Sequence, residues 1–153
     1  MPFVRIDALR AGSERLDALG RAVHEALVET LGIPSEDLFQ VLTDHDGTSS
    51  TLRHGTYPDI RRDDGIVYIA VTMRAGRTPE RKQALYRRIA ELAYNYAGTE
   101  PRNVFVTVTE NAPADWSLGE GVAQYLVPGG PGGASAPNQA GGGAGSGPRE
   151  AGS

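Results

Sequence analysis

Residues 66–98, IVYIAVTMRAGRTPERKQALYRRIAELAYNYAG, decide the fold of this chain. The apolar and β-branched run at the start of this stretch predicts a strand. Thr78 follows as a candidate N-cap, Pro79 suits the first helical position, and Gly98 is typical of a helix end. Between them, apolar residues recur at spacings of three and four: Leu85, Ile89, Leu92 and Tyr96. A further apolar run at 104–108 completes a predicted strand, helix, strand unit.

The same pattern occurs earlier in the chain. Arg10-Ala11-Gly12 matches Arg74-Ala75-Gly76, and each triplet stands between an apolar run and an amphipathic stretch. The first copy has predicted strands at 3–6 and 38–42, with Ser13 as the candidate N-cap of the helix between them. Its helical stripe and its end are marked by Leu16, Leu19, Val23, Leu27, Leu31 and Gly32. The chain is therefore predicted to contain an internal repeat.

Two such units specify an α/β (α+β) fold. A β-α-β crossover returns its second strand parallel to the first, with right-handed sense. We predict a four-stranded mixed sheet with two helices on one face. We also expect the strands to be apolar on both faces, because they contain Phe3, Val4, Ile6, Val67, Ile69 and Val71. No third helix is predicted to cover the open face, so we expect oligomerisation through it.

Composition limits the classes of function. The chain has 153 residues and a net charge of −4, which argues against nucleic-acid and membrane-surface partners. It has no cysteine, which excludes disulfides, and its three scattered histidines argue against a zinc site. Residues 2–127 fit one domain, and the Gly/Pro-rich segment 128–153 is predicted to be a disordered tail. Residues 44–65 are predicted to form a loop with a possible short hairpin. No membrane span or signal pattern is visible, so we expect a cytoplasmic protein.

Pro2 is the first candidate for chemistry. Removal of the initiator methionine before a small residue would leave a free secondary amine at the start of a strand. An α-amino group titrates near 7.7–8.0, so it is able to act as a base, an acid or an iminium-forming nucleophile. The alternative is an inert proline, because proline is common at this position.

Three charged residues are predicted to lie near strand ends. Arg74 and Arg77 follow the strand of the second unit and precede its helix, where anionic ligands bind in α/β folds. Two guanidinium groups there would bind a carboxylate, or else be solvated surface charges. Asp37, in the matching turn of the first unit, is a candidate acid or base or simply a turn residue. The candidates for an apolar pocket wall, or for additional core, are Trp116, Leu118 and Tyr125 in the segment 110–127.

These features resemble the tautomerase superfamily, and within it the malonate semialdehyde decarboxylase family. The resemblance spans nearly all of residues 2–127. Besides Pro2, it depends on HEALVE at 24–29, followed by GIP at 32–34 and Asp37, and on the segment 110–126 with its Glu-Asn and Ala-Asp-Trp-Ser motifs. The Arg-x-x-Arg spacing is similar to the cis-3-chloroacrylic acid dehalogenase branch, whereas the decarboxylases have Arg-x-Arg.

The resemblance implies a role for each site residue. Pro2 would be the catalytic N-terminal proline, cationic at neutral pH in decarboxylases, and Asp37 the acid that assists it or orients water. Arg77 and Arg74 would bind the carboxylate of a small substrate in a cofactor-independent, trimeric enzyme. The leading expectation is decarboxylation of a 3-oxo acid such as malonate semialdehyde. The alternatives are a 2-oxo acid enol–keto tautomerase, a hydratase or dehalogenase of short unsaturated acids, and a non-catalytic oligomeric relative.

Overall fold

The computed structural model describes residues 1–47 and 51–131. The chain divides into two compact units, Met1–Pro113 and Ala114–Ser153. The predicted tail at 128–153 lies mostly outside the described residues, and so its predicted disorder stays a prediction. Within the described part, no helix is both long enough and apolar enough to cross a membrane.

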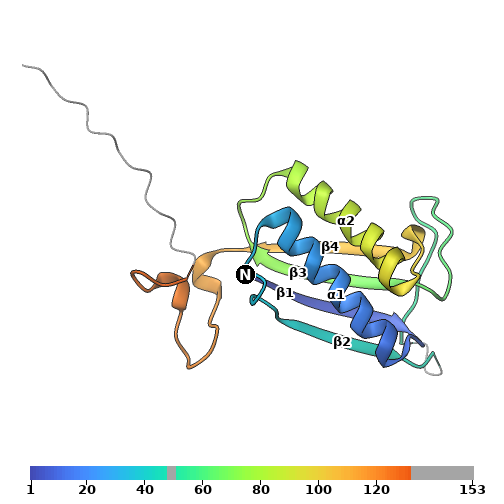
Figure 1. Ribbon diagram of the computed structural model, residues 1–153, viewed down its shortest axis with the longest axis horizontal. Coiled ribbons are helices and arrows are strands. Elements are labelled where there is room, and N and C mark those ends of the chain that lie inside the picture. The colour runs from blue at the N-terminus through green and yellow to red at the C-terminus, as the bar shows by residue number, and fades with distance from the viewer. Residues whose placement is uncertain (48–50, 132–153) are drawn as a thin grey trace, which may run out of the picture. The chain divides into compact units, whose positions relative to one another are not determined.

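The first unit is a single mixed sheet with two long helices (Figure 1). In chain order the elements are β1 (Pro2–Leu9), α1 (Gly12–Leu31), β2 (Gln40–His45), β3 (Val67–Arg74), α2 (Pro79–Ala97) and β4 (Val104–Asn111). The strand order is β2-β1-β3-β4, with β1 and β2 parallel, β3 and β4 parallel, and β1 antiparallel to β3. The predicted fold of two fused β-α-β units in a four-stranded mixed sheet is therefore confirmed. Short 3₁₀ helices occur at Pro101–Asn103, Pro113–Asp115 and Gln124–Leu126.

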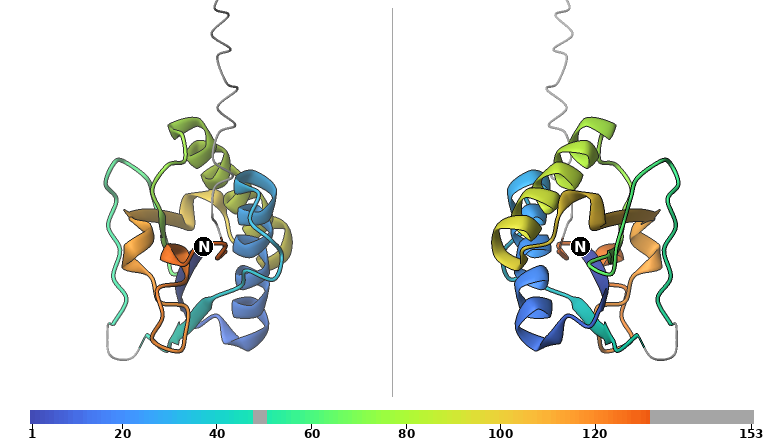
Figure 2. Two further views of the ribbon diagram at one scale, coloured as in Figure 1. Left: turned by 90° about the vertical axis from the view of Figure 1, so that its left-hand side faces the viewer. Right: turned by 90° about the vertical axis from the view of Figure 1, so that its right-hand side faces the viewer.

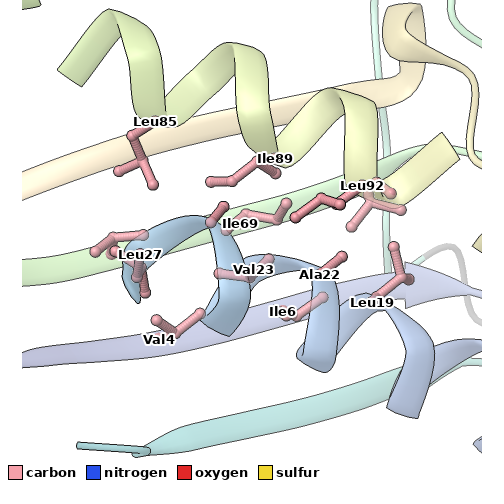
Figure 3. Close-up of a cluster of buried hydrophobic side chains, with 14 of the residues drawn as sticks. Val4, Ile6, Leu19, Ala22, Val23, Leu27, Ile69, Leu85, Ile89 and Leu92 are labelled. Carbon is pink, nitrogen blue, oxygen red and sulfur yellow. The ribbon is translucent and has the colours of Figure 1, made fainter. Parts of the chain in front are cut away.

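Both helices cover the same face of the sheet, as predicted (Figure 2). The apolar stripes of α1 and α2 meet side chains from the central strands β1 and β3 in one buried cluster (Figure 3). Its fully buried members include Val4, Ile6, Leu19, Leu27, Ile69, Leu85 and Ile89. Each such side chain stabilises the fold by roughly 1.5–3 kcal/mol. This core holds the strand ends in fixed positions.

The interpretation of the strands as apolar on both faces is confirmed for β1, where Phe3 is exposed and Val4 and Ile6 are buried, and is wrong for β3. Val67, Ile69 and Val71 are all buried beneath the helices, because residues two apart in a strand point to the same face. The open face of β3 instead carries half-buried Tyr68 and exposed Ala70. The large apolar side chains exposed on this face include Phe3, Val41 and Phe105, which are 36%, 38% and 44% exposed. The open face is therefore mixed in character.

Four of the five residues predicted at helix ends are confirmed. Thr78 caps α2 and accepts a hydrogen bond from the Arg81 N–H, while Pro79 occupies the first turn. Gly32 and Gly98 end the two helices in the left-handed conformation, with φ of 67° and 65°. These ends follow from local chemistry, which is why the sequence predicts them.

Ser13 does not cap α1. The helix begins at Gly12, and its first N–H groups are satisfied by a residue from the end of β2. The Asp44 carboxylate accepts hydrogen bonds from the N–H of Ala11 at 2.9 Å and of Gly12 at 3.0 Å. These two bonds hold the pKa of Asp44 below its usual range. Because this partner lies 32 or more residues away in the sequence, it replaces the local cap that Ser13 would have supplied.

The strand boundaries of the first unit also differ from the prediction. The strand expected at 38–42 is found at Gln40–His45, in register with Val4–Leu9 of β1. Residues 51–66 contain turns and bends and no strand, so the described part of the predicted loop holds no hairpin. This segment runs on the side of the sheet opposite the helices (Figure 2), where the Tyr68 hydroxyl donates to the Arg53 carbonyl.

Candidate active site

The start of β1 lies beside the end of β3. Because these strands are antiparallel, Pro2 pairs with Met73, the residue before Arg74. Pro2 is buried, and Met1 is half-buried. The strand order therefore brings the N-terminus to the point where β3 leads into α2 (Figure 1). A group held at this position is fixed by the sheet, as the sequence predicted for Pro2.

Both candidate arginines lie at this point. Arg74 is the last residue of β3, and Arg77 lies in the connection to α2, two residues before its first residue. The Arg77 guanidinium donates to the Arg74 carbonyl at 3.0 Å, so the two residues are linked directly. Both side chains are half-buried, and the N-terminus of α2 adds its own positive end to theirs. The arrangement suits an anion.

Asp37 joins the site from the turn before β2. Its backbone N–H donates to the Pro34 carbonyl at 3.0 Å, which fixes the turn. Its Oδ2 lies 3.7 Å from the α-amino nitrogen of Met1, and the two side chains are only 13% and 9% exposed. Its Oδ1 is buried and accepts no hydrogen bond from the described residues. The carboxylate therefore has an oxygen left to orient a second group.

The electrostatics of the amino terminus reflect all of these residues. Burial lowers the pKa of the Met1 α-amino group below its usual value. The Asp37 carboxylate opposes this and raises that pKa, whereas the positive charges of Arg74 and Arg77 lower it further. The predicted residues are thus close enough to alter the pKa of the terminal amine. An amine, a carboxylate and two guanidinium groups form the candidate active site.

Sequence reasoning gave no separate role to Glu110, which the structure places next to the arginines. Glu110 stands near the end of β4, where Arg74 pairs with Asn111. Its Oε2 accepts from the Gly76 N–H at 3.3 Å, and its Oε1 forms an ion pair with Lys82 of α2. The hydrogen bond from Lys82 is the main reason that the pKa of Glu110 is lowered. The sequence feature that points to Glu110 is its position near the end of the last strand of the second β-α-β unit.

Trp116, Leu118 and Tyr125 belong to the second unit. All three are half-buried, and the Leu118 N–H donates to Oε1 of Gln124 at 2.8 Å. The Gln124 amide in turn donates to the Gly119 carbonyl at 2.9 Å, so this segment is folded back on itself. The expectation that these three side chains line an apolar pocket wall stays a prediction.

The histidines have structural partners in the described residues. His24 contacts the Ser35 carbonyl at 2.7 Å, and His45 lies between Asp7 at 2.8 Å and Thr51 at 2.9 Å. Within residues 1–47 and 51–131, no group of three or more His, Cys, Asp or Glu side chains is arranged to hold a metal ion.

Comparison with known families gives consistent matches. A family model described as "Tautomerase enzyme" matches residues 37–119, and a second with the same description matches residues 2–59. The protein named "Probable tautomerase YusQ" of Bacillus subtilis (strain 168) is 36% identical over 128 residues, which cover 82% of this chain and 99% of YusQ. "Probable tautomerase YrdN" of the same organism is 31% identical over 128 residues, covering 83% and 98% of the two chains.

The chain is also similar to several solved structures. FG41 malonate semialdehyde decarboxylase, inhibited by 3-bromopropiolate, is 42% identical with a TM-score of 0.74, covering 81% of this chain and 94% of its own. Another malonate semialdehyde decarboxylase, described with decarboxylase and hydratase activities, is 27% identical with a TM-score of 0.73, covering 81% and 95%. The symmetric trimer of a fused 4-OT shares the fold, at 18% identity and a TM-score of 0.64, covering 78% and 94%.

Proposed function

Because this chain belongs to the tautomerase family of enzymes, we propose that it is a cofactor-independent decarboxylase of a small 3-oxo acid such as malonate semialdehyde. Support comes from the 42% identity to FG41 malonate semialdehyde decarboxylase, over 81% of this chain. The substrate is then a short carboxylate with a carbonyl group two carbons away. Such a molecule offers one anion for the arginines and one carbonyl oxygen for an N-terminal cation.

The observation that supports this proposal best is the grouping at the N-terminus. The α-amino group of Met1 lies 3.7 Å from the Asp37 carboxylate, and the charges of both arginines affect its pKa. Removal of Met1 transfers the terminal amine to Pro2, which is already held in β1. The nitrogen is then a secondary amine, with Asp37 as the negative charge that favours its protonated form.

In the proposed mechanism, Arg74 and Arg77 bind the substrate carboxylate through charge-assisted hydrogen bonds. Protonated Pro2 donates a hydrogen bond to the carbonyl oxygen. The bond between the carboxylate carbon and the α-carbon breaks, and its electron pair moves toward that oxygen as an enolate forms. Carbon dioxide leaves, and a proton added to the α-carbon yields the aldehyde. In a covalent variant, neutral Pro2 condenses with the carbonyl and releases water to form an iminium ion, which accepts the same electron pair as carbon dioxide leaves. The resulting enamine is protonated at the α-carbon, and water then hydrolyses it to the aldehyde and free Pro2.

A second candidate activity is enol–keto tautomerisation of a 2-oxo acid. The observation in its favour is the lowered pKa of the Met1 α-amino group, which occupies this position before Met1 is removed; burial is the main cause and the two arginines add to it. A neutral amine is able to remove a proton from one carbon or oxygen of the substrate and return it to another. The two candidates differ in the required form of Pro2: the hydrogen-bonding decarboxylase mechanism needs the cation and the tautomerase needs the free amine.

We also propose that the protein is a cytoplasmic trimer that assembles through the open face of the sheet. Support comes from the exposed Phe3, Val41 and Phe105 on that face. The fused 4-OT of the same fold is described as a symmetric trimer. Light scattering at micromolar concentration is expected to give three times the chain mass, and a stable folded monomer would contradict the assembly.

The test of the proposed activity begins with the mature N-terminus. Mass spectrometry should first show a chain without Met1. That chain is then offered 3-oxo, 2-oxo, acetylenic and halogenated short acids. We expect carbon dioxide and acetaldehyde from malonate semialdehyde, with activity falling as the pH rises through the pKa of Pro2. The matched control is the same chain with Met1 retained, which lacks the secondary amine. Equal turnover by both forms would exclude the mechanism, and no turnover of any acid would favour a non-catalytic relative.

A further inference from the structure

Glu110 connects three elements at the edge of the candidate active site. It stands on β4, one of its oxygens accepts from the Gly76 N–H at 3.3 Å, and the other pairs with Lys82 on α2. Its side chain is 30% exposed and that of Lys82 is 22% exposed, so the pair is partly shielded from water. The carboxylate therefore ties the connection between β3 and α2 to the neighbouring strand and to the helix that follows.

The residue after Gly76 is Arg77. The Gly76 backbone has a φ of +124°, which side-chain-bearing residues rarely adopt, so this turn has a specific shape. Beside it, the Ala75 N–H donates to the Asn111 carbonyl at 2.8 Å. Two consecutive N–H groups before Arg77 are thus held by the end of β4, one through the backbone and one through the Glu110 side chain. The second of these bonds can be removed by substituting Glu110, which leaves the amino-acid sequence of the turn unchanged.

We infer that Glu110 is a positioning residue, which fixes the turn so that Arg77 is ready to bind a substrate carboxylate. This inference rests on the proposed carboxylate-binding role of Arg77. The Glu110 carboxylate is near enough to the Arg77 guanidinium to interact with its charge, and by charge alone it would weaken the binding of an anion. Its removal therefore has opposite consequences under the two readings. If Glu110 acts only by charge, its loss strengthens carboxylate binding, and if it positions the turn, its loss weakens it.

Two double variants separate these effects because they have the same net charge. Both replace Lys82 with Met; one carries Glu110→Gln and the other Glu110→Ala. The single carbonyl oxygen of the glutamine remains available to the Gly76 N–H once Lys82 no longer competes for it. Alanine offers no acceptor. Glu29→Ala is the control, because it removes a carboxylate that pairs with Arg88, also on α2, at 2.6 Å.

The probe is malonate, a stable short dicarboxylate, with its Kd measured by calorimetry and Gly76 amide exchange followed by NMR. For Glu110→Ala with Lys82→Met, we expect malonate binding to weaken about tenfold and Gly76 exchange to accelerate. For Glu110→Gln with Lys82→Met, and for Glu29→Ala, the malonate Kd and the Gly76 exchange rate should stay close to those of the wild type. Equal Kd and equal Gly76 exchange in the two double variants would overturn the inference, as would tighter binding by the alanine pair. Wild type that binds malonate but turns over no oxo acid would count against the proposed function alone, and wild type that does not bind malonate would overturn both.

Discussion

Asp37 is expected to hold the terminal amine in its protonated form, and Asp37→Asn measures by how much. At the 3.7 Å between Oδ2 and the Met1 nitrogen, two unit charges interact by about 1 kcal/mol in water and by about 4.5 kcal/mol at an effective dielectric constant of about 20. Loss of Met1 moves the amine by one residue, at most about 3.8 Å. At the resulting limit of about 7.5 Å, the interaction is about 0.6 to 2.2 kcal/mol.

We therefore expect Asp37→Asn to lower the pKa of the Pro2 amine, because it removes a charge interaction of this size. The cation that decarboxylation requires is then lost at lower pH, so the high-pH limb of kcat/KM shifts to lower pH. The assay is a pH profile of the mature enzyme, together with an NMR titration of nitrogen-15-labelled proline. Asp17→Asn, which removes an exposed carboxylate paired with Arg21 at 3.5 Å, is the control. A limb that stays in place, or that moves to higher pH, would refute the reasoning.

Three further outcomes are expected. Arg77→Ala removes charge-assisted hydrogen bonds of about 1.5–3 kcal/mol, so kcat/KM should fall roughly ten- to a hundredfold, mainly through KM; an unchanged KM would remove Arg77 from the binding site. Asp44→Ala should lower the Tm, since it leaves the N–H groups of Ala11 and Gly12 without their acceptor. Because the folded pKa of Asp44 is depressed, this difference in Tm from wild type is present above its unfolded pKa and should shrink as the pH falls through its folded pKa. Deletion of residues 128–153 should leave the Tm and turnover unchanged, and a Tm lower by several degrees would show that the segment packs on the fold.

The parts of the fold set by neighbouring residues were predictable. Thr78 and Gly98 act on backbone groups within a few residues of themselves, so their roles are visible in the sequence. Ser13 failed as a cap because the helix begins one residue earlier, at Gly12, where Asp44 of β2 accepts from the N–H groups of Ala11 and Gly12. The shifted boundaries of β2 have a similar origin, since pairing with β1 extends the strand as far as His45. Contacts distant in sequence decided each of these differences.

For the candidate site, the residue types were predictable and their meeting was not. Pro2, Asp37 and the arginines were chosen one by one from their places at strand starts and ends. What brings them together is the antiparallel pairing of β1 with β3, which no local pattern specifies. The contact that Glu110 makes was not predictable for the same reason, because it depends on which turn lies beside the end of β4.

That pairing also determines how many sites a duplicated chain provides. Antiparallel alignment relates the two units by an approximate half-turn, so the end of β1 lies beside the start of β3, where Ala8 pairs with Val67. Arg10 there corresponds to Arg74, but it forms an ion pair with Asp64 at 2.7 Å. The polypeptide continues through that position into β3, so no terminal amine is available to react. Under the proposed function, we therefore expect each chain to bind a single equivalent of substrate at saturation.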